Sequence, residues 1–226
     1  MSARPVIVLR PQPGNAATLA AAHHHNLVAH SFPLFEVAPM EWHAPQGSFG
    51  AILAGSANVF RHGGTQLSAF RSVPVMAVGA TTAEAARTAG FTVSCIGEGG
   101  LQPLVETLSP GDYLRLAGQD RVTLSPPAAV RIATEVVYAA RPLPVPPALC
   151  ALLGKGGVVL LHSGEAARHF ARECERLGIS RNHIYLACLA PRIADLAGSG
   201  WGAIETAKTR TDTDLLALAS RMCQTV

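Results

Sequence analysis

Hydroxyl residues follow a buried apolar strand in residues 76–91, an arrangement that can hold an anion. This stretch has the pattern of a strand end, a tight exit at Gly79 and an alanine-rich helix capped by Thr81 or Thr82. The unpaired amides and positive dipole end of such a helix attract carboxylates and phosphates. Gly90 suits the left-handed position just past the helix. The stretch therefore predicts an anion-binding turn near Thr82.

A second copy of this pattern lies later in the chain. Residues 186–201 resemble residues 76–91, and residues 158–167 resemble residues 51–60. The first pair of stretches is offset by 110 residues and the second by 107. The matched residues are Gly90 with Gly200, Phe91 with Trp201, and Ser56 with Ser163. Two matches at nearly one offset indicate a duplicated α/β domain, with chance similarity between strand–turn–helix units as the alternative.

Composition narrows the class of protein. The chain has 226 residues, of which 49% are apolar and 15% charged, so a substantial core is expected and disorder is not. The net charge of +3 and the lack of a polybasic run argue against nucleic acid as a partner. Five cysteines without a CxxC pair argue against a disulfide framework. With no signal-peptide pattern and no apolar run long enough to span a bilayer, we expect a cytoplasmic protein without a membrane segment.

Histidine and cysteine do not form a convincing metal or nucleophile motif. Consecutive residues of a helix point in different directions, so His23, His24 and His25 cannot converge on one ion. Cys95 and Cys188 lie in strand patterns and have the character of small buried apolar residues. No metal site is therefore predicted.

The remaining pattern alternates short apolar strands with helices, which is typical of parallel sheets. Asn15 is expected to cap the first helix and Asn26 to end it, and a helix is expected over residues 126–131. The strands are expected at residues 5–10, 27–32, 51–54, 73–78, 91–96, 112–116, 134–140, 158–161, 183–188 and 201–206. The other helices are expected at residues 16–25, 83–89, 102–108, 148–153, 164–177, 191–197 and 213–222, with one more after residue 58.

Two proline-bounded extended segments suggest how the chain is divided. If residues 33–38 pair with residues 136–142, they form a two-stranded linker. Residues 39–135 would then make one contiguous α/β domain. Residues 1–32 and 143–226 would make the other, which is discontinuous.

The sequence resembles the uroporphyrinogen-III synthase family over nearly the whole chain. No single motif is specific, but their order and spacing together indicate the family. The shared features are Arg10-Pro11, Ser56–Val59, Ala77–Ala83 as Ala-Val-Gly-x-x-Thr-Ala, Leu114–Arg121 as Leu-Arg-x-x-x-x-x-Arg, Val136-Val137-Tyr138, Ser163-Gly164 before a helix reaching Phe170, and Gly200-Trp201.

The resemblance implies an α/β fold of two Rossmann-like parallel-sheet domains joined by a two-stranded β linker, with the first domain discontinuous. It implies a cofactor-free hydro-lyase that cyclises hydroxymethylbilane to uroporphyrinogen III in haem biosynthesis, with loss of water and inversion of the terminal ring. Tyr138 matches the family's tyrosine proposed to assist loss of the hydroxyl. The residues then expected to bind the substrate carboxylates are Arg10, Ser56, Ala57, Asn58, Thr82, Ser163, Gly164 and Arg192.

Some positions depart from the family pattern or support other interpretations. Leu9 and Gly55 stand where hydroxyl residues are common in the family, and Arg192 replaces the counterpart of Thr82. Tyr138 alone is also compatible with a core or linker tyrosine, and Arg10 with an ion pair at a strand end. His162 is interpreted as incidental because it is not part of the family pattern.

The alternative functions are a non-catalytic two-domain protein that binds a small anion, and an inactive relative of the synthase. A nucleotide-dependent enzyme is disfavoured because no GxGxxG follows the first strand. The expected partner is a linear tetrapyrrole, with no nucleic acid and no membrane. A monomer is expected, and the resemblance allows a transient contact with hydroxymethylbilane synthase.

Overall fold

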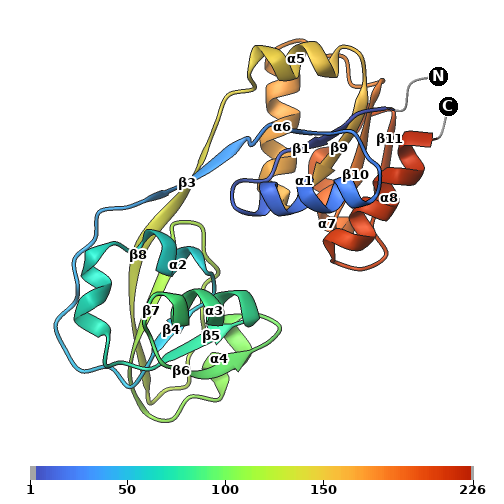
Figure 1. Ribbon diagram of the computed structural model, residues 1–226. Coiled ribbons are helices and arrows are strands. Elements are labelled where there is room, and N and C mark those ends of the chain that lie inside the picture. Colours follow the sequence, from blue (N-terminus) through green and yellow to red (C-terminus); the bar gives the residue numbers. More distant parts are fainter. Residues whose placement is uncertain (1–3, 225–226) are drawn as a thin grey trace. The chain divides into compact units, whose positions relative to one another are not determined.

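The computed structural model describes residues 4–224 and divides into two compact units (Figure 1). One unit combines the chain up to Glu36 with the chain from Arg141 onward. The other unit is Val37–Ala140. The first unit is therefore discontinuous in sequence, and the second is inserted into it.

The discontinuous unit is built on a parallel sheet of five strands. These are β1 (Val6–Val8), β2 (Ala29–Ser31), β9 (Gly157–Leu161), β10 (Ile184–Cys188) and β11 (Ala203–Thr206). Their order across the sheet is β11-β10-β9-β1-β2, and every neighbouring pair is parallel. All residues of β1 and β9 are buried, as expected for short apolar strands covered on both faces.

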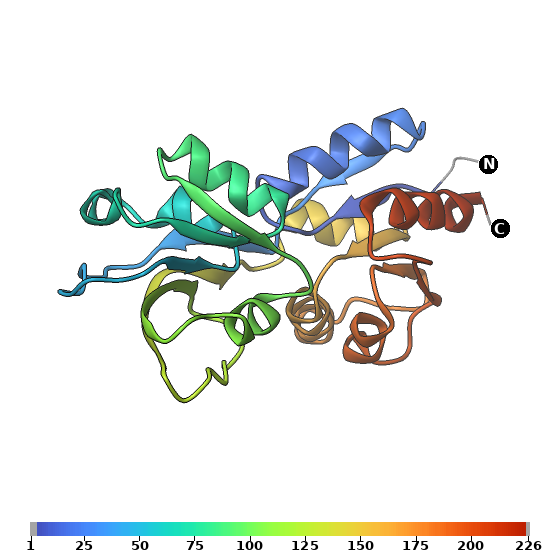
Figure 2. The same ribbon diagram turned by 90° about the horizontal axis from the view of Figure 1, so that it is seen from below.

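Helices cover both faces of this sheet. They are α1 (Gly14–His24), α5 (Pro147–Leu153), α6 (Gly164–Arg176), α7 (Pro191–Ala197) and α8 (Asp212–Gln224). Figure 2 shows α1 and α8 on one side of the sheet, with α6 and α7 on the other. The first pair encloses a core that contains Ala22 and Leu216, and α5, α6 and α7 enclose one that contains Leu149, Phe170 and Ile193.

The contiguous unit repeats this plan with a six-stranded sheet. Its strands are β3 (Phe35–Pro39), β4 (Ile52–Ala54), β5 (Val75–Val78), β6 (Val93–Gly97), β7 (Gly111–Gly118) and β8 (Val130–Pro142), in the order β3-β8-β7-β4-β5-β6. One face carries α2 (Asn58–His62), a 3-10 helix η1 (Thr65–Phe70) and α3 (Ala80–Thr88), and the other carries α4 (Leu101–Glu106). Strands β4 to β8 are parallel to one another, and β3, which pairs with β8, makes the sheet mixed.

The two sheets share one strand order, which is consistent with the duplication suggested by the sequence. Strands β8-β7-β4-β5-β6 correspond to β2-β1-β9-β10-β11. The corresponding strands follow one another without interruption in the contiguous unit. In the discontinuous unit, the counterparts of β7 and β8 come first in the chain. The two units therefore have the same strand order in the sheet but are related by a circular permutation of the chain.

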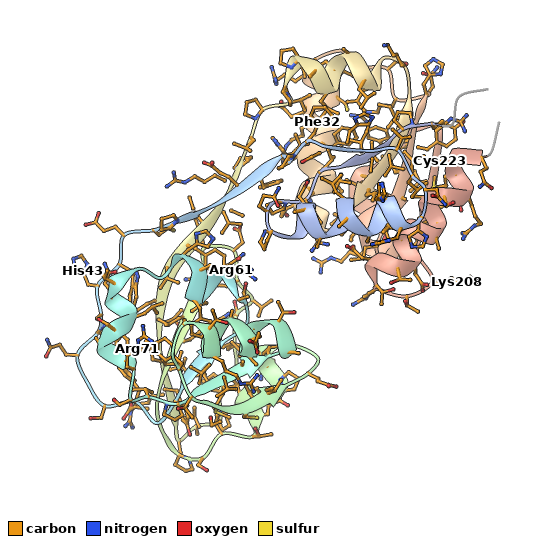
Figure 3. All side chains as sticks on the ribbon, in the orientation of Figure 1. Phe32, His43, Arg61, Arg71, Lys208 and Cys223 are labelled. Carbon is orange, nitrogen blue, oxygen red and sulfur yellow. The ribbon has the colours of Figure 1, made fainter. Side chains whose placement is uncertain are left out.

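An aromatic cluster repeats with the sheets. The Phe60 and Phe91 ring centroids are 5.5 Å apart, and the guanidinium of Arg71, labelled in Figure 3, lies 5.1 Å from the centre of the Phe91 ring. The counterparts, each 110 residues later, are Phe170, Trp201 and Arg181. There the ring centroids are 5.4 Å apart and the guanidinium lies 4.9 Å from the indole. In each unit the cluster packs a helix, α2 or α6, against an aromatic residue that follows a later helix, Phe91 after α3 or Trp201 after α7.

The chain passes between the units along β3 and the end of β8. The Met40 N–H donates to the Val137 carbonyl and the Leu143 N–H to the Leu34 carbonyl, so the two strands run antiparallel. On the side of the discontinuous unit, α6 holds the chain that follows β8. The His169 ring N–H donates to the Leu143 carbonyl over 2.7 Å, and Glu173 accepts from the Val145 N–H over 3.2 Å.

Replacing Glu173 with glutamine is expected to lower the free energy of unfolding by about 1–2 kcal/mol. Two hydrogen bonds of 2.8 Å from Arg176 outweigh the effect of burial and lower the pKa of Glu173 to about 2, so the carboxylate is charged at neutral pH. Glutamine lacks that charge. Urea unfolding at pH 7 measures the loss, with the exposed Glu175→Gln as the control on the same helix. Equal stability of Glu173→Gln and wild type would contradict the anchoring role.

Three local expectations from the sequence are wrong. Asn15 does not cap α1, because the helix starts one residue earlier and the buried Asn15 amide instead donates to the Val8 and Arg10 carbonyls. Neither Thr81 nor Thr82 caps α3, whose N-cap is Gly79 at φ 77°. No helix forms over residues 126–131, since β8 already begins at Val130. Asn26, at φ 54°, does take the expected left-handed position.

Candidate functional site

In the contiguous unit, a pocket opens at the carboxyl ends of the parallel strands. Its volume is about 250 Å³. Ligands of open parallel sheets bind at this edge, because the strand ends and helix starts meet there. The residues lining it include Gly55, Ser56, Val78, Gly100, Arg115, Gly118, Asp120, Arg121 and Tyr138.

Tyr138 reaches this pocket from β8. An irregularity between Ala117 and Gly118 brings Tyr138 opposite Gly118 in the β7–β8 ladder. A Cβ atom at Gly118 would lie 2.6 Å from Tyr138 Cζ and 2.9 Å from its hydroxyl oxygen, so the ring occupies the space that a side chain would need. Among the described residues, none is hydrogen-bonded to the Tyr138 hydroxyl. The hydroxyl is therefore available to a ligand in the pocket.

A histidine lies beside Tyr138. The His62 and Tyr138 ring centroids are 6.4 Å apart. Burial, and then the charge of Arg61, lower the pKa of His62 below its ordinary value. The His62 imidazole is therefore uncharged at neutral pH and adds no positive charge beside Tyr138.

The turn before α2 supplies one of the expected binding residues to this pocket. Ser56 lines it, and its Oγ accepts a hydrogen bond of 3.2 Å from the Asn58 N–H. Ala57 is buried and Asn58 is half-buried, and neither lines the pocket. Gly55, where the family often has a hydroxyl residue, also lines it and has open space at its Cβ position.

Thr82 lies apart from this pocket. Because α3 starts at Ala80, Thr82 falls on the side of the helix that faces the core, and only 4% of it is exposed. Thr81 is exposed at the helix start instead. The structure thus does not bring Thr82 together with Ser56 and Tyr138.

In the discontinuous unit, a pocket of about 420 Å³ collects Ser163, Gly164 and Arg192. Ser163 caps α6 by accepting a hydrogen bond of 3.2 Å from the Ala166 N–H, as its position before the helix suggested. Gly164 begins that helix, and Arg192 lies in the first turn of α7. Three of the predicted binding residues therefore lie around one pocket.

The pocket is positively charged. Arg168 and Arg210 line it together with Arg192, while Glu165 is its single carboxylate and pairs with Arg168. Within residues 4–224, neither Arg192 nor Arg210 has a carboxylate within 4.0 Å. A ligand with a carboxylate would supply the missing counter-charges. The sequence offered no local signal for Arg168 or Arg210, because Arg168 on α6 and Arg210 in the loop after β11 come to one pocket only in the folded chain.

Arg10 does not line this pocket and already has a partner. Its Nη1 lies 3.1 Å from Asp212 Oδ2, and Asp212 also accepts from Thr18 over 2.6 Å. His162 Nε2 lies 2.8 Å from Asp212 Oδ1, and only 9% of the His162 side chain is exposed. His162, which the sequence interpretation treated as incidental, lines the pocket and links it to this network. Leu9, before Arg10, is fully buried in the core.

This network makes the stability of the protein pH-dependent. Burial alone would raise the pKa of Asp212, but hydrogen bonds from His162 and Thr18 and the charges of His162 and Arg10 together lower it to about 2. A lowered carboxyl pKa contributes stability that is present above the unfolded pKa, near 3.8, and is lost as the pH falls through about 2.

Asp212→Asn is therefore expected to be less stable than wild type at pH 7, with a difference that shrinks between about pH 4 and pH 2. Urea unfolding over this pH range measures the difference. Asp195→Asn, an exposed carboxylate on α7, is the matched control and should change the stability little at pH 7. A difference that stays constant down to pH 2 would contradict the ion-pair network.

Residues 4–224 contain neither a metal-binding cluster nor a membrane-spanning helix. No group of three or more histidine, cysteine, aspartate or glutamate side chains in residues 4–224 is placed to hold a metal ion. None of the helices in that part of the chain is long and apolar enough to cross a bilayer.

Comparison with known proteins gives one family. Residues 17–217 match the family model described as uroporphyrinogen-III synthase HemD. The chain is similar in structure to uroporphyrinogen-III synthetase from Helicobacter pylori, with 15% identity, a TM-score of 0.66, and 97% of this chain and 99% of that chain covered. A mutant uroporphyrinogen III synthase from the extremely thermophilic bacterium Thermus thermophilus is also 15% identical, with a TM-score of 0.49 and coverage of 97% and 99%. No curated protein sequence matches significantly.

Proposed function

The chain belongs to the uroporphyrinogen-III synthase family, lyase-type enzymes of haem biosynthesis, and on that premise we propose that it cyclises hydroxymethylbilane to uroporphyrinogen III. The observation that carries this proposal is the family match, which extends over residues 17–217. The similar structure from Helicobacter pylori supports only the fold, because its sequence is just 15% identical to this chain.

The proposed reaction begins with loss of the terminal hydroxyl of hydroxymethylbilane. The hydroxyl takes up a proton and leaves as water, which generates an electrophilic, protonated azafulvene. The substituted carbon of the far terminal ring attacks this end and forms a spiro intermediate. One bond of that intermediate breaks and re-forms in the inverted sense, a proton is released, and the closed ring is uroporphyrinogen III. No electrons are gained or lost overall.

We assign Tyr138 to the departing hydroxyl. Its phenol lines a pocket at the strand ends, and no described residue occupies it. A hydrogen bond from the phenol to the leaving oxygen would stabilise the charge that develops as the carbon–oxygen bond breaks. His62 lies beside Tyr138 but does not line the pocket, so the phenol is assigned as the donor.

We assign the substrate carboxylates to the polar turns of both units. Ser163, Gly164 and Arg192 line the positively charged pocket of one unit, and Ser56 lines the pocket of the other. Ala57 and Asn58 are assigned to shaping the turn that presents Ser56, because the Asn58 N–H already donates to the Ser56 hydroxyl. Arg10 and Thr82 are assigned indirect roles, because Arg10 is paired with Asp212 and Thr82 is buried.

Further proposals concern the setting of the enzyme. We propose that it acts as a cytoplasmic monomer and receives its unstable substrate through a transient contact with hydroxymethylbilane synthase. We also propose that residues 39–135 form one domain and residues 1–32 with 143–226 the other, with linker strands at 33–38 and 136–142.

A coupled assay tests the proposed function. Hydroxymethylbilane synthase converts porphobilinogen to the linear tetrapyrrole in the presence or absence of this protein, and the products are oxidised and separated as porphyrin isomers. The proposal predicts a shift from isomer I, the product of spontaneous closure, to isomer III. Isomer I alone, from folded protein, would favour the inactive relative or the non-catalytic anion-binding protein.

A further inference from the structure

A buried arginine of the contiguous unit has no counter-charge. Arg115 lies on β7 between Leu114 and Leu116, and only 7% of it is exposed. Its Nε is buried without a hydrogen-bond partner, and no carboxylate of residues 4–224 lies within 4.0 Å of its guanidinium. A buried, unpaired charge costs free energy, so a protein retains one where a ligand supplies the partner.

A second cation reinforces the charge at this place. Arg121 lines the same two pockets as Arg115. Burial, and then the charge of Arg121, lower the pKa of Arg115, although the guanidinium remains protonated at neutral pH. Asp120 also lines the smaller pocket, but among the described residues it forms no ion pair with either arginine. The two cations are therefore not neutralised by the unit itself.

The space around Arg115 is open to a ligand from the strand ends. Arg115 lines both the pocket that contains Tyr138 and a neighbouring cavity of about 600 Å³. Gln119, Thr123 and Thr134 line the larger cavity. Residues 119–129 form a loop, and the helix expected over residues 126–131 is absent, so this part of the β7–β8 face is incompletely packed.

We propose that Arg115, assisted by Arg121, binds one carboxylate of the tetrapyrrole substrate and thereby positions it in the pocket that contains Tyr138. This inference rests on the proposed function. A guanidinium suits a carboxylate because its paired N–H groups match the two carboxylate oxygens. Arg115 reaches the pocket from a strand of the sheet, so the bound carboxylate would be held more rigidly than one bound by a loop.

Arg115→Met tests this role, because methionine keeps much of the side-chain length and removes the charge. The expected KM for hydroxymethylbilane rises about 10- to 100-fold with little change in kcat, as for the loss of a charged hydrogen bond. The melting temperature of the free variant should equal or exceed that of wild type, since an unpaired buried charge has been removed. Arg115→Lys should recover part of the KM, because it restores the charge without the paired N–H groups.

Arg131→Met is the matched control. Arg131 lies on the neighbouring strand β8, is largely exposed, and pairs with Asp112 outside both pockets. This variant should retain the wild-type KM. A large fall in the melting temperature of Arg115→Met with an unchanged KM would overturn the proposal, because Arg115 would then be a structural residue.

Binding of the product separates this inference from the proposed function. The melting temperatures of wild type and Arg115→Met are compared with and without uroporphyrinogen III under anaerobic conditions. If Arg115 binds a carboxylate, uroporphyrinogen III should raise the melting temperature of wild type more than that of Arg115→Met. Equal gains would overturn the site whatever the activity. A wild-type protein that is stabilised through Arg115 but forms no isomer III would contradict the proposed function and leave the carboxylate site standing.

Discussion

Replacing Tyr138 with phenylalanine is expected to lower kcat for uroporphyrinogen III formation by about 10²-fold, at the lower end of the range for a positioned proton donor. The phenol would no longer assist departure of the substrate hydroxyl, while the ring would still fill the space beside Gly118. Residual activity is expected because the pocket still orients the linear tetrapyrrole for ring closure. Steady-state kinetics with immediate oxidation and isomer separation measures the effect.

Two further variants sharpen this prediction. Tyr113→Phe is a matched control, because Tyr113 lies on β7 in the same unit and its hydroxyl donates to the Ser109 carbonyl, outside the Tyr138 pocket. It should retain kcat. Gly118→Ala should lower kcat as Tyr138→Phe does, since the added Cβ would lie 2.6–2.9 Å from atoms of the Tyr138 phenol and displace it. Full kcat in Tyr138→Phe would contradict the assigned role.

The double variant Arg192→Met/Arg210→Met is expected to raise KM by about 10- to 100-fold with a smaller effect on kcat. Both arginines line the pocket of the discontinuous unit, and neither has a carboxylate partner among the described residues. The substrate is rich in carboxylates, and losing two charge-assisted contacts to it weakens binding of the substrate and of the transition state alike. KM therefore rises more than kcat changes. The wild-type KM should also rise with ionic strength more steeply than that of the double variant.

Arg172→Met is the control for this pair, because Arg172 is exposed on α6 and does not line the pocket. Its KM and salt dependence should match those of wild type. If the double variant behaved as this control does, the positively charged pocket would have no part in substrate binding.

The sequence predicted the fold well because the relevant signals are local. Short apolar runs identify the parallel strands, and Gly90, at φ 84°, has the left-handed conformation expected after α3. Ser163, which directly precedes α6, caps that helix. The helix expected at residues 126–131 does not form, because the β7–β8 ladder already begins there at Val130. Pairing with a neighbouring strand outweighed the local pattern.

The candidate site was less predictable, because it depends on contacts between distant residues. His162 and Asp212 are 50 residues apart, and their contact could not be inferred from either neighbourhood. The burial of Thr82 follows from the start of α3 at Ala80, which shifts it to the core side. Arg115 was part of a family motif, but a sequence cannot show that a charge lacks a partner.

The most direct test of the account is the isomer composition formed by catalytic amounts of the protein. One molecule of protein is supplied for many molecules of hydroxymethylbilane as the substrate is generated, and the porphyrin isomers are quantified over time. We expect isomer III in large molar excess over the protein. Isomer I as the sole product, or isomer III limited to one molecule per molecule of folded protein, would contradict it.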